Sequence, residues 1–159
     1  MKGTGMTKLE FSTDLDLLRE GLRSNASVES LEDNLASVMS YENPQCIGKL
    51  LMCLDDNYIY QEFMWSILHS VESFQIDVYV RELVKFLPMV RLKAPEWAVT
   101  LLLRILNSEE HDGLLLNQFE QWPAVGKDIY NNIITEIERR LPGKFDNQIA
   151  KIKISLFKN

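Results

Sequence analysis

Apolar residues recur three or four positions apart through nearly the whole chain, and prolines, asparagines and glycines divide them into segments. This spacing places the apolar side chains of each segment on one side of an α-helix, where they can be buried against neighbours. Asn43-Pro44 and Pro95 indicate helix starts, because proline fits the first helical turn. Pro88 is expected to end a helix at Leu87. The pattern predicts an all-α fold.

The expected helices begin and end at such signals. Ser27 and Ser108 are expected to act as N-caps, since a serine hydroxyl can accept a hydrogen bond from a free amide of the first turn. Residues 152–156 alternate like a short strand, but the start at Asp146-Asn147 and the lack of a hairpin partner favour a helix. The expected helices lie near residues 13–24, 28–38, 44–54, 58–74, 76–87 and 95–106, after Ser108, between Lys127 and Leu141, and in 143–159.

An internal repeat emerges when the chain is compared with itself. Two proline-started helices, each followed by two further helices, are typical of HEAT or armadillo repeats, in which antiparallel helices stack in right-handed layers. Chance similarity between Leu-rich amphipathic helices is the alternative. The pattern predicts a single helical domain over 1–159, with N-terminal helices in 1–41, two repeats in 42–142 and a C-terminal helix in 143–159. The matches at an offset of 51 are Pro44 with Pro95, Leu50-Leu51 with Leu101-Leu102, and Asp77-Val78-Tyr79 with Asp128-Ile129-Tyr130; Leu87-Pro88 matches Leu141-Pro142 at 54.

Charge is distributed unevenly along the chain. Residues 1–80 contain 13 Asp and Glu against 5 Lys and Arg, whereas residues 81–159 contain 10 acidic and 12 basic residues. Direct nucleic-acid binding is not expected, because phosphate contacts need clustered basic side chains. An acidic surface instead favours a basic protein partner. The alternative is a solvated surface that only keeps the protein soluble.

The chain lacks the signals of export or membrane insertion. No apolar run approaches the roughly 18 residues that a membrane span needs. No apolar segment follows Lys2, as a secretory signal would require. Two cysteines in 159 residues do not form a disulfide framework. We therefore expect a cytoplasmic protein without membrane contact.

Catalytic and metal-binding patterns are mostly missing. With His69 and His111 as the two histidines, a multi-histidine metal centre cannot form within one chain. Cys46 and Cys53 are seven residues apart, about 10 Å along one helix, which is too far for a disulfide and unlike zinc-site spacing. His69 with Glu72 could form a general base oriented by a carboxylate, but such a histidine more often packs with its nitrogens satisfied. We expect no enzyme activity, no catalytic or metal site and no cofactor.

Two acidic segments are candidates for partner binding. One combines acidic residues with tyrosines, which supply rigid contact area and a hydroxyl, and the other follows about one repeat later. Stacked repeats would place both on one edge as an acidic ridge, whereas ordinary helix capping by acidic residues is the alternative. The large aromatic residues Phe63, Trp65, Trp97 and Phe119 are expected to fill the core. The candidate contact residues are Asp55, Asp56, Tyr58, Glu62, Glu109, Glu110 and Asp112.

Residues of about 42–142 resemble a family of immunity proteins from bacterial polymorphic and contact-dependent growth inhibition toxin systems. The resemblance rests on the Leu-rich helices ending in Trp65-Ser66-Ile67-Leu68-His69, on Leu87-Pro88 leading into Ala94-Pro95-Glu96-Trp97, and on the run from Leu101 to Asn107. It does not extend to the N-terminal 40 residues.

The resemblance implies an all-helical, HEAT-like protein that binds a cognate toxin, often a nuclease, inside the producing cell. The acidic surface is compatible with this function, because a nuclease is usually basic. We therefore interpret the chain as a cytosolic immunity protein that binds the basic C-terminal domain of a toxin, a nuclease, one-to-one. The alternative is a helical-repeat adaptor with no toxin partner.

Overall fold

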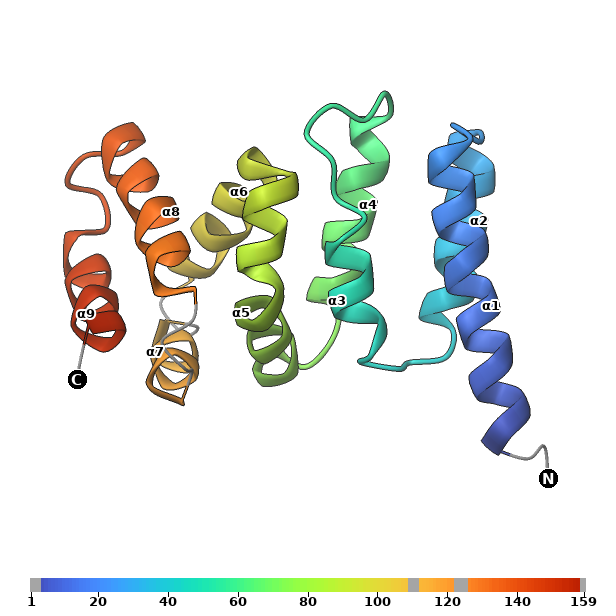
Figure 1. Cartoon of the computed structure of the whole chain (residues 1–159), viewed down its shortest axis with the longest axis horizontal. Helices are drawn as coiled ribbons and strands as arrows, with labels where there is room; N and C mark the ends of the chain where they lie inside the picture. The colour runs from blue at the N-terminus through green and yellow to red at the C-terminus, as the bar shows by residue number, and fades with distance from the viewer. Residues whose placement is uncertain (1–3, 109–111, 122–125, 158–159) are drawn as a thin grey trace. The chain divides into compact units, whose positions relative to one another are not determined.

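The computed structural model describes residues 4–108, 112–121 and 126–157. All regular elements in these ranges are α-helices, so the predicted all-α class is confirmed (Figure 1). The helices are α1 Thr4–Arg23, α2 Val28–Met39, α3 Cys46–Leu51, α4 Gln61–Glu72, α5 Ile76–Lys93, α6 Pro95–Leu106, α7 Asp112–Gln121, α8 Lys127–Arg140 and α9 Asp146–Phe157.

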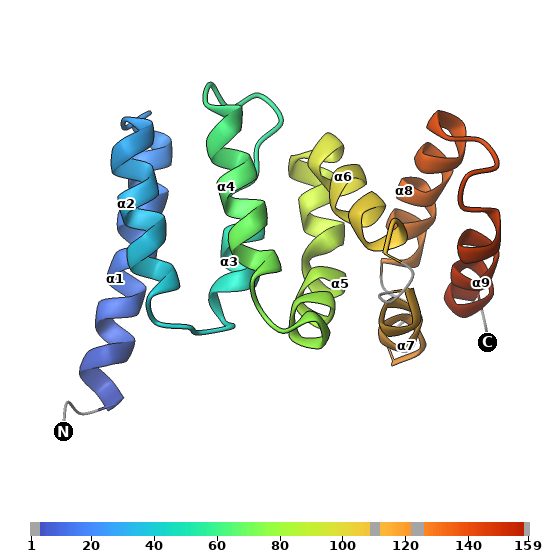
Figure 2. The same ribbon diagram turned by 180° about the vertical axis from the view of Figure 1, so that it is seen from behind.

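The chain is divided into two compact units, a first unit of residues 1–74 and a second unit of residues 75–159. In the first unit α2 packs against α1 and α4, and α3 packs against α4. Figures 1 and 2 show α2 and α4 side by side on one side of this unit, with α1 and α3 on the other. In the second unit α5 packs against α6, α7 and α8, and α9 packs against α7 and α8. The single domain over 1–159 stays a prediction.

Local signals place α2 as expected. Asn25 has a left-handed backbone, with φ of 52°, and this separates α2 from α1. The Ser27 hydroxyl then accepts a hydrogen bond from the Ser30 amide at 3.2 Å, which satisfies a free N–H of the first turn. The apolar residues of the predicted stripe, Leu31, Leu35 and Val38, are all buried.

The α3 segment begins later than the sequence indicates. The Asn43 side-chain oxygen accepts a hydrogen bond from the Gln45 amide at 3.0 Å, but this bond lies in a turn before the helix, whose N-cap residue is Gln45. Pro44 lies in a turn, and the α-helix begins at Cys46. The predicted apolar face of this segment, Ile47, Leu50, Leu51 and Leu54, is completely buried.

Helix α5 continues through Pro88 to Lys93, so the prediction that Pro88 ends the helix was wrong. Proline has no N–H, and its place in a helix leaves the carbonyl four residues earlier without its usual donor. That carbonyl belongs to Val84, and it accepts a hydrogen bond from the buried hydroxyl of Tyr130 in α8. A partner 46 residues away in the sequence thus satisfies the group that Pro88 leaves free.

Two helices begin at the spacing of the predicted repeat, but the two compact units do not correspond to the two predicted repeats. Helices α5 and α8 begin 51 residues apart, at Ile76 and Lys127. The boundary after residue 74 separates α5 from α3 and α4, whereas α8 shares a unit with α6 and α7. HEAT-like stacking therefore stays a prediction.

Charged side chains of the second unit pair with each other across helices. The Arg140 guanidinium donates two hydrogen bonds to the Glu96 carboxylate, each of 2.8 Å, and a third to Glu136 at 2.6 Å. Lys153 of α9 donates to Glu138 of α8 at 2.9 Å. Basic and acidic groups in this unit thus connect α6, α8 and α9.

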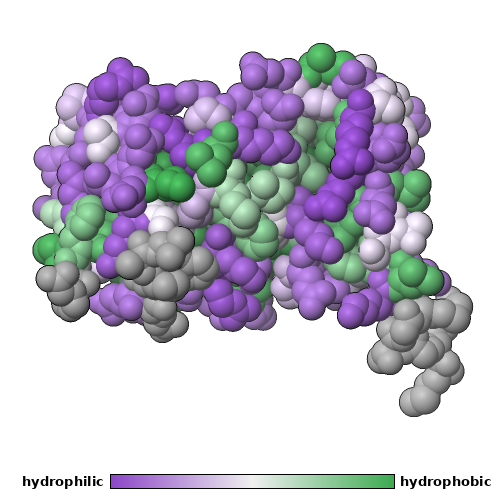
Figure 3. Space-filling view, viewed as in Figure 1, coloured by the Kyte–Doolittle hydropathy of each residue, from purple (hydrophilic) through white to green (hydrophobic). Residues whose placement is uncertain are grey.

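Hydrophilic residues cover most of the face drawn in Figure 3. Among the described residues, no helix combines the length and apolar character needed to cross a membrane.

Candidate partner-binding site

The loop between α3 and α4, residues 52–60, carries most of the first predicted acidic segment and is held by its own hydrogen bonds. The Asp55 carboxylate accepts a hydrogen bond from the Asn57 amide at 2.9 Å. The side-chain amide of Gln61 donates to the backbone carbonyls of Asp55, Asp56 and Tyr58 at 3.2, 3.2 and 2.8 Å. The loop therefore has a defined backbone shape that leads directly into α4.

The four described candidate residues have different environments. Asp55 and Asp56 are half-buried, and the Asp55 carboxylate already has a structural role in the loop turn. The ring of Tyr58 packs edge-to-face on Tyr60, with 6.0 Å between the ring centroids. Glu62 is exposed on the first turn of α4. Glu62 is thus better placed for partner contacts than Asp55.

Tyr58 differs from an exposed tyrosine in the burial of its hydroxyl group. Its hydroxyl is buried, with no hydrogen-bond partner among the described residues. This burial raises the pKa of Tyr58, and Tyr60 and Asp55 raise it further. The hydroxyl is therefore held in its neutral form as a potential hydrogen-bond donor at the base of the loop.

The side chains of the second predicted acidic segment lie outside the described residues. Glu109 and Glu110 lie outside the described residues, and Asp112 is the first residue of α7 with a side chain that is not described. All three belong to the second unit, and each unit is described by itself. The acidic ridge that combines both segments stays a prediction.

Trp65 lies on the surface, which corrects its predicted place in the core. The buried face of α4 consists of Phe63, Met64, Ile67, Leu68 and Val71, a complete stripe that excludes position 65. Trp65 is 41% exposed, and its ring lies 6.0 Å from the ring of His69 at an angle of 39°. The aromatic type favoured the core, whereas the helical spacing could have identified this surface position.

The other large aromatic residues behave differently. Phe63 and Trp97 are buried, as predicted, and the side chain of Phe119 lies outside the described residues.

The exposed side of α4 brings apolar, aromatic and acidic groups together. Glu62, Trp65 and His69 are exposed at spacings of three and four residues, so they follow one side of the helix. Ile59, just before the helix, is 62% exposed. We call these four residues the α4 face. Ser66, next to Trp65, donates a hydrogen bond to Glu32 of α2, which links the two helices beside this face.

The surroundings of the α4 face are strongly acidic. After Arg23, up to the end of the first unit at residue 74, the sequence has eight Asp and Glu residues against one Lys, Lys49, and no further Arg, which gives a formal charge of −7. Lys49 lies on α3, and α2 and α4 contain no Lys or Arg. The resulting negative potential attracts a cationic partner and repels an anionic one.

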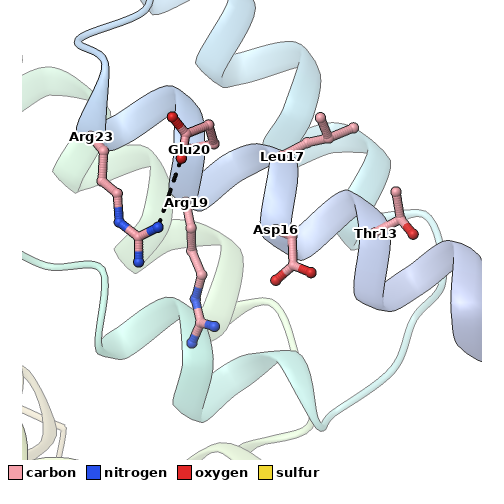
Figure 4. A pocket seen from close by; sticks show the side chains of 6 residues that line it. All are labelled: Thr13, Asp16, Leu17, Arg19, Glu20 and Arg23. Carbon is pink, nitrogen blue, oxygen red and sulfur yellow. Dashed lines mark ion pairs between the residues drawn. The ribbon is translucent and has the colours of Figure 1, made fainter.

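A hollow along α1 is a second surface feature of the first unit. It has a volume of about 380 Å³, and all the side chains around it come from this helix (Figure 4). Glu20 and Arg23 form an ion pair across 3.7 Å, and both side chains are well exposed. The hollow combines both signs of charge, so it has no clear preference for a cation or an anion. Its lining residues are Thr13, Asp16, Leu17, Arg19, Glu20 and Arg23.

Cys46, Cys53 and His69 carry the thiol and imidazole groups among the described residues. Both cysteines are free, and burial raises the pKa of Cys46 to about 11, so its thiol stays protonated at neutral pH. His69 is exposed in the last turn of α4 with its ring against that of Trp65, and His111 lies outside the described residues. The described residues contain no group of three or more His, Cys, Asp or Glu side chains able to hold a metal ion.

Comparison with known proteins identifies the family. The family model of immunity protein 30 matches residues 19–114, a range that includes α2 to α6 and the whole acidic stretch around the α4 face. It begins earlier than the resemblance seen in the sequence, and it ends before α8. No curated protein and no solved structure matches the chain. Since the family model covers more than half of the sequence, the chain belongs to the immunity protein 30 family.

Proposed function

We propose that this protein neutralises a cognate toxin domain in the cytosol of the producing cell by binding it one-to-one, without catalysis. Membership of the immunity protein 30 family is the observation that carries the proposal. The toxin domain is basic and is a nuclease, because the acidic stretch after Arg23 in the first unit complements a surface that holds nucleic acid. Binding covers the substrate cleft, or holds the toxin so that substrate cannot enter.

The proposed contacts come from both acidic segments. Those in the first unit are Asp55, Asp56, Tyr58 and Glu62, and those in the second are Glu109, Glu110 and Asp112. A HEAT-like stack of the two repeats would place the segments on one edge, which makes the ridge part of this proposal.

Co-expression with the C-terminal domain of the protein encoded immediately upstream tests the function. We expect growth rescue and a one-to-one complex with a Kd in the nanomolar range or below in calorimetric titration. Toxicity that continues together with the lack of a complex would contradict the immunity function and favour an adaptor with another partner. A complex without rescue would separate binding from neutralisation.

A pair of charge reversals tests the first acidic segment. Asp56→Lys with Glu62→Lys should slow association at low salt by about tenfold or more, because long-range attraction acts mainly on the association rate. Asp55 is left unchanged, since its carboxylate holds the loop turn. Asp16→Lys with Glu20→Lys on α1 is the matched control, because it reverses the same number of charges at exposed carboxylates of the same unit. An equal effect of the control would show that net charge alone matters, and an unchanged rate for the double variant would refute the assignment.

A further inference from the structure

We propose that the α4 face is the surface on which the toxin docks, and that Trp65 anchors the complex by stacking against an arginine side chain of the toxin. This inference rests on the proposed function and names the surface and the partner chemistry that would carry it. The contact residues proposed above supply charge, whereas Trp65 would supply most of the binding free energy.

Trp65 lies on the surface of α4 and not in its buried stripe. Five apolar residues already complete the buried stripe of α4, and Trp65 points away from this stripe with 41% of its surface exposed. Its remaining apolar area becomes buried only when a partner covers it. Tryptophan is among the residues that contribute most to binding when they lie at the centre of an interface.

The neighbours of the Trp65 ring are held in place by contacts within the first unit. The Trp65 ring packs against the His69 ring on the next turn, and the adjacent Ser66 is hydrogen-bonded to Glu32 of α2. The loop before α4 is held by the three hydrogen bonds of Gln61. A preorganised anchor loses little conformational entropy on binding, so more of its contact energy appears as affinity.

The surrounding charge selects the partner. Within the first unit, the chain from residue 50 to residue 74 contains no Lys or Arg and carries Asp55, Asp56, Glu62 and Glu72. A second copy of this surface or a nucleic acid would bring like charges together. An arginine fits best, because its planar cation stacks on an indole ring while its N–H groups reach nearby carboxylates.

The exposed apolar residues on α1 do not offer the same combination. Leu17 is 52% exposed, but it borders the hollow that also contains Arg19 and Arg23. A cationic partner would be repelled there as well as attracted. Leu17 is therefore a suitable control for loss of an exposed apolar side chain in the same unit.

The test uses the full chain and the toxin domain encoded upstream, with calorimetric titration and dissociation kinetics for wild type and three variants. We expect Trp65→Ala to weaken binding by about 30-fold or more, mainly through faster dissociation, at both low and high salt. Trp65→Phe should retain part of the affinity, because it keeps a smaller aromatic face. Leu17→Ala should change the Kd by less than about twofold, as expected of a residue outside the interface.

The outcomes separate the two proposals. Circular dichroism melting of each variant shows whether the fold is intact, and Trp65→Phe keeps the test valid if Trp65→Ala is destabilised. If the wild type binds the toxin and both Trp65 variants have the same Kd as the wild type, the docking surface is overturned. The immunity function then still stands. Lack of wild-type binding would overturn the function, and the inference falls with it. A wild-type dimer that becomes a monomer in Trp65→Ala would instead show that a second copy covers the face.

Discussion

The two units use their charged side chains for different purposes. The first unit has 12 acidic and 5 basic residues, a formal charge of −7, whereas the second has 11 acidic and 12 basic residues, a formal charge of +1. In the second unit Arg140 and Lys153 form hydrogen-bonded ion pairs that connect helices. In the first unit α2 and α4 contain no Lys or Arg.

This difference suggests a division between structure and recognition. Carboxylates whose charge is neutralised within the fold contribute to packing and are of little use to a partner. Carboxylates in a region with almost no cations keep their potential, which reaches about a Debye length, 8 Å at physiological salt. The unit with the unbalanced charge is therefore the better candidate for partner recognition.

The largest effect on stability is expected in the second unit, at the hydrogen bond between Tyr130 and Val84. Tyr130→Phe leaves a buried carbonyl without this donor and should lower the free energy of unfolding by about 1–3 kcal/mol. Equilibrium urea unfolding measures the loss. In a Pro88→Ala background the restored amide can donate to the same carbonyl, so Tyr130→Phe should cost clearly less. An equal cost in both backgrounds would contradict this role for Tyr130.

Tyr41→Phe provides the matching change in the first unit. The Tyr41 hydroxyl donates to the Asp14 carboxylate at 2.7 Å, at a partly exposed position. Water can replace this donor, so the loss should be smaller than that for Tyr130→Phe. A larger loss would reverse the comparison between the units.

An intermediate effect is expected when equal numbers of charges are removed from the two units. Neutralising Glu29, Asp33 and Glu62 should slow toxin association about tenfold at low salt and much less at high salt. Neutralising Asp128, Glu136 and Glu138 should leave the association rate within about twofold and instead reduce stability. Stopped-flow kinetics at two salt concentrations measures both sets. Equal slowing would show that total charge, not its location, steers the toxin.

The smallest effect concerns the ion pairs of Arg140. Hydrogen bonds from Arg139 and Arg140 lower the pKa of Glu136 to about 2, and a hydrogen bond from Arg140 lowers the pKa of Glu96. Because these pKa values are lower in the folded state, the stabilisation is present above the ordinary glutamate pKa and disappears as the pH falls towards 2. Arg140→Met should therefore lower the Tm at pH 7, by no more than about 3 °C for such exposed pairs.

Melting curves between pH 7 and pH 2 check this pH dependence. The Tm difference between wild type and Arg140→Met should shrink through this range. A difference that stays constant would mean that the methionine acts through packing and not through charge.

Elements controlled by nearby residues were predictable from the sequence. Ser27 and the stripe from Leu31 to Val38 specify α2 through contacts within a few residues. Continuation of α5 past Pro88 depends on Tyr130, which is 46 residues away, so no local signal could reveal it. The candidate site was predictable in part. The acidic loop was visible, and the helical spacing of α4 places Trp65 outside the buried stripe, whereas the three hydrogen bonds from Gln61 to the loop carbonyls emerge only from the fold.

The hydrogen bonds of Gln61 have a consequence for how recognition can evolve. The half-buried side chain of Gln61 holds the loop by donating to backbone carbonyls, which every amino acid possesses. Side chains at positions such as Asp56 and Ile59 can therefore be exchanged while the loop keeps its shape. Mutation can then explore new partner specificities one residue at a time without a matching loss of foldability.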